Sequence, residues 1–571
     1  MHSPGKGHAS SGTTRKHAHG HMSSNGSAAS MQTTADPNEL LVVADQHPAN
    51  LFLGPEELVV TGTHRPSITS AAASFVLKRG SRTSSKRIPY DIILDVKLER
   101  QPSLDDLLLT VHCLKTSTDA ELRTLKYEVP VHHELVAQEW IERLLAHAYP
   151  ATRRHRRFKV FVNPASGPGK AKAIWQTKCQ PIFEAAGCHL DVSFTEGRDH
   201  AKQACQTLDL EKYDGIAIVS GDGLVHEILN GLALRTDARK ALMTPLAALP
   251  AGSANAFGVN VSSPARGRNP AYQCLVAIKG RPMSIDLASV TQGSQRYFSF
   301  LSQAFGLMAD VDLGTEDNRW MGDTRFVLGF VQGVLSERTY NCTLSMRIVG
   351  QGTTKESKGA LVDDHKKRAT DTIAQEGSLN SKDYSLPRLR FGTVQDPLPE
   401  QEAIPVSIDK PLDVAPGLSK WTTFRGPVST VYAGLQPYVA KDYMPFPLAC
   451  GDGLIDISIA LPLSRYEGLS GLDGAGEGNT LHHSNVQYYR VEAYRLTPEG
   501  RATKGKVAKV HNEKSEEVKS NEVSPVLAKE YISIDGESVP YEPFQVEAHR
   551  GLGRTFTLDP SGSLYKPDQW K

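Results

Sequence analysis

The sequence lacks the long apolar runs of a membrane-spanning chain. Nowhere in its 571 residues is there a stretch approaching the ~18–20 apolar residues that cross a bilayer, and the first residues contain no apolar run typical of a secretory signal. Its seven cysteines form no C-x-x-C pair, so neither a zinc site nor a disulfide framework is expected, and their odd number favours a reducing compartment. These absences predict a cytoplasmic protein.

An excess of one charge sign is also missing. The chain has 64 basic and 63 acidic residues, so its composition gives no indication of a nucleic-acid partner. A chain of 571 residues is too long for one hydrophobic core, because cores stop growing at roughly 250–300 residues. We therefore expect two or three domains.

The first part of the chain has almost nothing to bury. Residues 1–38 are mainly Ser, Gly, His and Thr, and we expect them to form a disordered tail. His17, His19 and His21 could bind a metal ion. A solvated tail is favoured, because nothing nearby would fix a ligand geometry.

Residues 39–150 show the alternation of half-buried strands. Apolar residues alternate with polar ones in DIILDVKLE and LLTVHCLK, and ELVAQEWIERLLAHAY has one apolar helical stripe that includes Val136 and Trp140. Several strands followed by one amphipathic helix resemble a pleckstrin-homology-like module. The alternative is a β-rich accessory domain packed on the rest. The run TRRHRR that follows could contact anionic lipid or serve as a solvated linker.

From residue 155 the pattern changes to a strand, a glycine-rich loop and a helix, repeated. FKVFVNP leads into ASGPGKA, GIAIVSGDG into LVHEILNGL, and PLAALP into AGSANAFG. Continuous apolar runs of this kind predict a parallel sheet covered on both faces. We expect an α/β nucleotide-binding domain over residues 155–290.

Residues 291–571 return to alternation and predict an antiparallel β-sandwich. In GLIDISIALPL, for example, Ile455, Ile457, Ile459 and Leu461 share one face. Two stretches, at about 352–385 and 500–525, are rich in Lys, Glu, Ser and Asp. We expect both to be disordered insertions.

The three glycine-rich loops point to a phosphate site. In open α/β sheets ligands bind at the carboxyl ends of the strands, where glycine lets the backbone approach an anion and N–H groups face it. A P-loop is excluded because Gly169-Lys170 is followed by alanine, and a dinucleotide fingerprint because Gly221-Asp-Gly223 leads to His226. The site therefore belongs to another class of nucleotide-binding loop.

The combination NPASGPGKA, SGDGLVHEILNGL and LPAGSANAFG resembles the catalytic domain of the diacylglycerol-kinase-like lipid kinases. Within that superfamily the chain resembles the sphingosine kinases, through FGLMADVDLGTEDNRWMGDTRF and IDGESV as well. The resemblance covers residues 158–335 continuously and scattered strands to about 548. It implies a kinase that uses ATP and Mg²⁺.

By this resemblance Asp222 is the general base that accepts the proton of a lipid hydroxyl. The alternative is that Asp222 only caps the helix that follows it, but capping alone would not explain the glycines on both sides. Glu537 is a candidate for holding the Mg²⁺ or ordering its waters. The residues implied at the nucleotide are Asn163, Ser166, Gly167, Gly169, Thr195, Ser220, Gly223, Glu227, Gly252, Ser253, Arg319, Arg325, Gly536 and Glu537.

The resemblance also implies a lipid-binding side. Asp312 matches the acidic partner of the substrate ammonium and Ser302 a polar neighbour of the reacting hydroxyl, while Asp310 should point to the other side if this segment is extended. A membrane-resident substrate implies peripheral association with a membrane surface. Six apolar residues could line the lipid pocket or form ordinary core: Phe305, Leu307, Met308, Phe326, Leu328 and Phe330.

These observations predict ATP-dependent phosphorylation of sphingoid long-chain bases such as sphingosine, dihydrosphingosine and phytosphingosine. Two alternatives remain open. The same fold could phosphorylate ceramide or diacylglycerol, or the chain could be a non-catalytic lipid-binding adaptor built on the N-terminal module.

Overall fold

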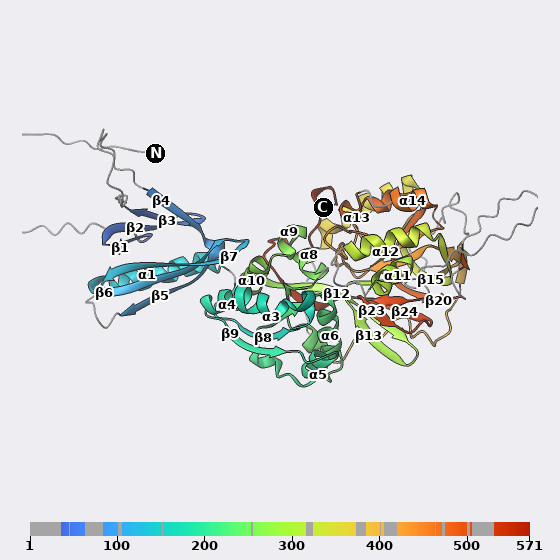
Figure 1. Ribbon diagram of the computed structural model, residues 1–571, viewed down its shortest axis with the longest axis horizontal. Coiled ribbons are helices and arrows are strands. Elements are labelled where there is room, and N and C mark those ends of the chain that lie inside the picture. Colours follow the sequence, from blue (N-terminus) through green and yellow to red (C-terminus); the bar gives the residue numbers. More distant parts are fainter. Residues whose placement is uncertain are drawn as a thin grey trace, which may run out of the picture.

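The computed structural model describes residues 36–44, 46–62, 84–100, 106–150, 152–252, 255–315, 324–372, 384–399, 401–404, 420–462, 464–470, 474–499, 503–504 and 530–570. Three parts follow one another along the long axis in Figure 1: a strand-rich module, an α/β part and a β-rich part. Most of the tail expected at residues 1–38, and most of the insertion expected at 500–525, lie outside the described residues.

The N-terminal module is an antiparallel sheet followed by one helix. Its strands, in the order β4-β3-β2-β1-β7-β6-β5, are β1 (Glu39–Ala44), β2 (His47–Leu53), β3 (Glu57–Gly62), β4 (Ser84–Pro89), β5 (Ile93–Arg100), β6 (Asp106–Thr116) and β7 (Asp119–Pro130). The helix α1 (Glu134–Ala148) buries Trp140 and Leu144 against this sheet. Val136, which we expected on the apolar stripe, is 50% exposed, because Ala137 occupies the buried position instead.

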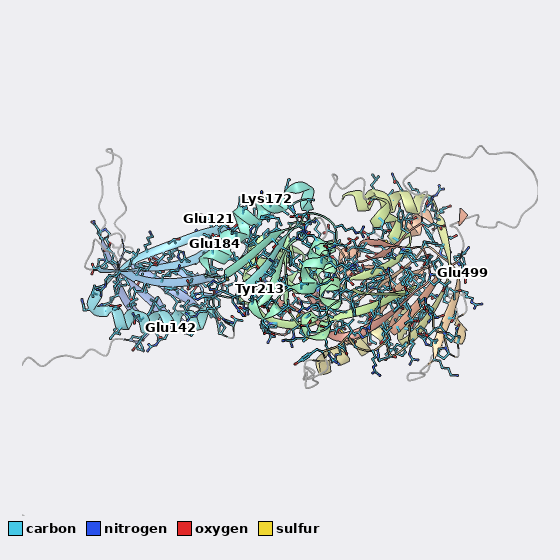
Figure 2. The ribbon with its side chains drawn as sticks, turned by 90° about the horizontal axis from the view of Figure 1, so that it is seen from below. Glu121, Glu142, Lys172, Glu184, Tyr213 and Glu499 are labelled. Atoms are coloured by element: carbon cyan, nitrogen blue, oxygen red, sulfur yellow. The ribbon has the colours of Figure 1, made fainter. Side chains whose placement is uncertain are left out.

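The TRRHRR run joins the module to the rest, and one of its arginines, Arg156, is buried instead of solvated. The buried Arg156 guanidinium donates to the carbonyls of Ala277 and Gly280, each at 2.6 Å. Arg154 pairs with Glu142 on α1. Figure 2 labels Glu142 in the N-terminal module. The burial of Arg156 could not be predicted from the sequence, because its partners are backbone carbonyls more than 100 residues away in the chain.

The α/β part has four parallel strands in the order β9-β8-β10-β11: β8 (Arg157–Val162), β9 (His189–Phe194), β10 (Gly215–Ser220) and β11 (Leu246–Pro250). Helices α5 (His200–Thr207), α6 (Asp222–Ala233), α8 (Ala256–Ser262) and α10 (Pro270–Lys279) lie among the connections. The β10 residues are all buried, as the continuous apolar run predicts for a sheet covered on both faces. The expected parallel sheet is therefore confirmed.

The C-terminal part is mainly antiparallel, as expected. Its long strands are β12 (Arg281–Gln292), β15 (Arg338–Gly352), β20 (Val486–Pro498) and β24 (Phe544–Thr557), and its shorter ones include β13 (Gln295–Ser299), β14 (Ser302–Gly306), β18 (Thr430–Gly434), β19 (Ile455–Ala460), β22 (Ile532–Ile534) and β23 (Glu537–Val539). Helices α11 (Leu307–Gly314) and α12 (Thr324–Leu335) are inserted between β14 and β15. Ile455, Ile457 and Ile459 share the core of this part.

The boundary expected at residue 290 is not a break in the structure. Strand β24 pairs with β12 along its length and also reaches the parallel sheet, where Thr555 pairs with Leu246 on β11. The Phe556 ring then packs edge-on against Phe158 of β8. The α/β part therefore includes a strand from near the end of the sequence, which linear motifs do not reveal.

The expectation of disorder over 352–385 is wrong for its first half. Residues Lys355–Thr372 form the helix α13. Leu361 is buried and the buried Lys358 ammonium donates to the carbonyl of His483 at 2.7 Å. The buried Leu361 and Lys358 hold this charged helix in place. Its low apolar content therefore did not mean disorder. Residues 373–383 lie outside the described chain.

Candidate active site

The predicted loops meet at one edge of the parallel sheet. Asn163 follows β8, Thr195 follows β9, Ser220 ends β10 and Gly252 follows β11. The Asn163 amide donates to the carbonyl of Val219 at 3.1 Å, which ties the first loop to the neighbouring strand. The carboxyl ends of the four strands thus bring these backbones together, as expected for a parallel sheet.

Close backbone contacts explain the glycines of these loops. A Cβ added at Gly252 would lie 2.5 Å from the Cα of Gly221, so the second and third loops touch through their backbones. Gly167 has φ +58°, and a Cβ there would collide with the carbonyl oxygen of Ala251. Gly169 has φ +76° but faces open space. Three loops therefore pack into one backbone surface at the strand ends.

Two side chains add to this surface. Ser166 begins a short helical turn (Ser166–Gly169), and its hydroxyl lies 3.4 Å from the carbonyl of Ala251. Asn255, which sequence reasoning missed, has φ +49° and bonds the third loop through both side-chain atoms, accepting from the Gly252 amide and donating to its carbonyl. The only sequence signal was its position within LPAGSANAFG.

Asp222 is the first residue of α6, and its carboxylate contacts a different helix. One oxygen accepts from the Ala256 amide at 2.9 Å and the other from the Phe257 amide at 3.0 Å, at the start of α8. Helix α6 has no side-chain cap, so the alternative that Asp222 caps its own helix is not supported. Asp222 therefore joins the second glycine-rich loop to α8, the helix that follows the third loop.

Burial raises the pKa of Asp222, and the nearby Asp535 carboxylate adds to the rise, whereas the two amide bonds oppose it. A carboxylate with a raised pKa is a stronger base than an exposed one. Asp222 therefore combines a fixed orientation with increased basicity, which is what proton abstraction from an alcohol requires.

Glu227 lies farther along α6 and holds a third helix. Its carboxylate accepts from the amides of Ala201 at 2.9 Å and Lys202 at 3.3 Å, at the start of α5. Burial raises the pKa of Glu227. Both bonds go to Oε1, so one oxygen of Glu227 binds the start of α5, and its predicted contact with the nucleotide stays a prediction.

The turn of residues 535–537, here called the Asp-Gly-Glu turn, connects β22 to β23 and reaches both parts of the molecule. A Cβ on Gly223 would lie 3.2 Å from Oε1 of Glu537, whose other oxygen accepts from Arg198 at 2.9 Å. A Cβ on Gly536 would lie 3.9 Å from Oδ2 of Asp312. The turn therefore stands between the glycine loops and the predicted lipid side.

Asp312 lies on α11 and accepts from the Ser533 hydroxyl at 2.5 Å. Ser302 begins β14 and is buried beside Tyr432, whose pKa burial raises strongly. Asp310 is fully buried and accepts from the Tyr340 hydroxyl at 2.5 Å. The segment is helical, not extended, but two residues along a helix still separate the side chains by about 200°. Only Asp312 lies beside the Asp-Gly-Glu turn.

The apolar candidates for a lipid pocket lie in three different environments. Phe305 and Leu307 belong to the core of the β-rich part, and Phe330 packs against it. Met308 packs with Tyr432, Tyr443 and Phe446 in a separate cluster. Leu328 on α12 is 41% exposed. The core interpretation is therefore correct for Phe305 and Leu307.

The structure does not describe the side chains of three residues that we predicted at the nucleotide. Ser253 and Arg319 lie outside the described residues, and Arg325 lies in α12 without a described side chain. Within the described chain, no group of three or more His, Cys, Asp or Glu side chains could hold a metal ion. A Mg²⁺ ion bound mainly by phosphates and water needs only one or two carboxylates, and Glu537 beside Gly223 fits that requirement.

Comparison with protein families defines the class. The diacylglycerol kinase catalytic domain family matches residues 157–290, which contain the parallel sheet and the glycine loops. A family described only as a domain of unknown function matches residues 41–150, the N-terminal module. The α/β part is thus a lipid-kinase catalytic domain.

Individual relatives narrow this class. Sphingoid long chain base kinase 4 of Schizosaccharomyces pombe is 32% identical over 74% of this chain and 79% of its own length. Sphingoid long chain base kinase 5 of Saccharomyces cerevisiae is 28% identical over 84% and 70%, and sphingosine kinase 1 of Arabidopsis thaliana is 29% identical over 71% and 76%. The chain belongs to the family of sphingoid long-chain base kinases.

Proposed function

We propose that the protein transfers the γ-phosphoryl group of ATP to the primary hydroxyl of a sphingoid long-chain base, giving the 1-phosphate. The observation that carries the proposal is the Asp-Gly-Glu turn, which contacts Gly223 in the Asp222 loop on one side and Asp312 on the other. The lipid headgroup would then lie at this turn, between the Asp222 loop and Asp312.

Asp222 would act on the acceptor. The hydroxyl oxygen forms a bond to the γ-phosphorus, the bond to the bridging oxygen of ADP breaks, and the hydroxyl proton passes to the Asp222 carboxylate. Positioning and charge neutralisation provide most of the acceleration in phosphoryl transfer. The two amides that bind Asp222 fix its orientation before any substrate arrives.

Asp312 would select the substrate. A sphingoid base carries an ammonium beside the reacting hydroxyl, whereas ceramide has a neutral amide and diacylglycerol has no nitrogen there. A half-buried carboxylate attracts a cation more strongly than an uncharged group, so it would bind the ammonium of a sphingoid base better than an uncharged headgroup. Asp312 thereby disfavours both alternative substrates.

The nucleotide would lie over the glycine loops, beside Asn163, Ser166, Gly167, Gly169, Thr195, Ser220, Gly223, Gly252 and Ser253. Arg319, Arg325 and the Asp-Gly-Glu turn would close on its phosphates, since guanidinium groups bind phosphate oxygens in a bidentate way. Mg²⁺, held by Glu537 and the phosphates, would neutralise phosphate charge. These assignments follow the family motifs and the shared strand-end edge.

Delivery of the lipid would require peripheral contact with a membrane surface. No described helix is long and apolar enough to span a membrane. Leu328 and Leu335 on α12 are 41% and 47% exposed, and Tyr466 on the adjoining α14 (Arg465–Ser470) is 83% exposed. These side chains would enter the headgroup region. The N-terminal module, with its strands followed by one helix, would act as a pleckstrin-homology-like accessory unit.

A turnover assay with ATP and a panel of sphingosine, dihydrosphingosine, phytosphingosine, ceramide and diacylglycerol tests this proposal. We expect 1-phosphate formation from the three long-chain bases, and equal use of diacylglycerol would contradict the role of Asp312. Asp222→Asn should lower turnover by roughly 10²–10⁴-fold, the usual contribution of a general base. Asp209→Asn, at an exposed site, is the matched control. A fully active Asp222→Asn enzyme would refute the mechanism.

A further inference from the structure

The Asp-Gly-Glu turn has an unusual backbone that must be held in place. Asp535 has φ +52° and Gly536 has φ +84°, which matches a two-residue hairpin turn with both central residues left-handed. Asp-Gly is a favoured sequence for such a turn. The turn alone does not explain the Asp535 side chain, which is fully buried.

The Asp535 carboxylate is saturated by donors from the protein. A carboxylate offers about four lone-pair sites. Five groups donate to this one: the Ser299 hydroxyl at 2.6 Å, the amides of Phe300, Leu301 and Ser302 at 3.0, 2.9 and 2.9 Å, and the His226 ring at 2.8 Å. Asp535 therefore has no oxygen left for a nucleotide or a metal ion, although it stands in the nucleotide motif.

Of these five bonds to Asp535, the one from His226 links the α/β part to the β-rich part. His226 lies one turn after Asp222 on α6, whereas the other four donors lie at the start of the β-rich part. The Asn230 side chain lies beside the ring: its oxygen accepts from the Phe298 amide at 2.8 Å, and its nitrogen, 3.2 Å from Nε2 of His226, also donates to the carbonyls of His226 and Phe298, each at 2.9 Å. A carboxylate oxygen accepts, so the proton of the bond between His226 and Asp535 lies on Nδ1 of His226.

We propose that Asp535 and His226 are a positioning pair that sets the separation between the catalytic base and the lipid-side turn. Asp535 also holds Ser302 by accepting from its amide, and its own amide donates to the Ser302 carbonyl at 2.7 Å. One carboxylate thus fixes α6, the predicted hydroxyl neighbour Ser302 and the turn that carries Glu537. This inference rests on the proposed function, because the separation matters only if a phosphoryl group crosses it.

Replacement of His226 tests the pair. Asp535→Asn would turn an amide N–H toward other donors and threatens folding, so the histidine variants carry the test. His226→Leu removes the donor, whereas His226→Asn keeps an N–H close to the position of Nδ1. We expect His226→Leu to lower kcat by about 100-fold, the cost of a misplacement of about 1 Å. The KM values for ATP and sphingosine should change little, because neither binding surface contains His226.

His226→Asn should recover at least half of that loss on a logarithmic scale, and His132→Leu, at an exposed site in the module, should match the wild type. Thermal unfolding checks that every variant is folded. Unchanged kcat in His226→Leu, or equal losses in His226→Leu and His226→Asn, would overturn the positioning role while the proposed function stands. A wild type that phosphorylates no sphingoid base would overturn both.

Discussion

The two sides of the site hold their carboxylates in different ways. On the nucleotide side, Asp222 and Glu227 accept from backbone amides at the starts of α8 and α5. On the lipid side, Asp312 accepts from the Ser533 hydroxyl, and Asp310, on the same helix but in the core, accepts from the Tyr340 hydroxyl. Amides at a helix start are fixed by the helix, whereas hydroxyls rotate.

This difference suits the two substrates. ATP presents the same phosphates in every turnover, so a rigid backbone surface serves it. A lipid headgroup must enter and leave with its chain, so side chains that can rotate serve it better. In the proposed function, the nucleotide side would be specified by glycine and main-chain geometry, and the lipid side by the charge of single residues.

The sharpest test of this comparison removes the charge on the lipid side. Asp312→Asn keeps the shape but loses a charge-assisted bond, which is worth about 1.5–3 kcal/mol, so kcat/KM for sphingosine should fall by roughly 10–150-fold. Turnover of each lipid at varied concentration measures this. Asp310→Asn, on the same helix but in the core, should leave the ratio of sphingosine to diacylglycerol use unchanged. A similar ratio change in both variants would remove the special role of Asp312.

A pair of glycine variants tests the main-chain specification. Gly167 and Gly169 both have left-handed φ, but only Gly167 would collide with Ala251. Gly167→Ala should destabilise the protein by about 1–3 kcal/mol more than Gly169→Ala, in line with overpacking, and should raise the KM for ATP. Denaturation curves and ATP titrations of both variants measure the difference. Equal effects would show that backbone strain, not the close approach, matters at this loop.

A third test concerns the pH dependence that Asp310 gives to the stability of the fold. Burial raises the pKa of Asp310 to about 7, against the bond from Tyr340 and the nearby Arg338. Because the unfolded value is about 3.9, the folded state binds more protons between pH 4 and 7, and stability falls as pH rises through this window. Asp310→Asn removes a slope of at most about 1.4 kcal/mol per pH unit.

Thermal unfolding at pH 5 and pH 8 measures this effect. Between these values the Tm of Asp310→Asn should fall less than that of the wild type. Parallel falls in both proteins would show that Asp310 is ionised in the folded state across this range.

Much of the nucleotide side could be predicted from the sequence, because its information is local. Each glycine loop follows its own strand, and parallel strands bring their ends together. The importance of Asp535 could not be predicted, since its partners come from residue 226 and from residues 299–302. Arg156 and α13 were misread for a related reason: their partners are carbonyls and core positions far away in the chain.

Strand β24 has a consequence for how the protein folds during synthesis. Until residues 544–557 leave the ribosome, β11 has no neighbour on one side and the socket beside Gly215 lacks the Phe556 ring. An unpaired parallel edge is a surface on which nascent chains associate. The α/β part is therefore translated early but lacks its last strand until late in synthesis. Chaperones that shield exposed strand edges could act during the translation of the residues between β11 and β24.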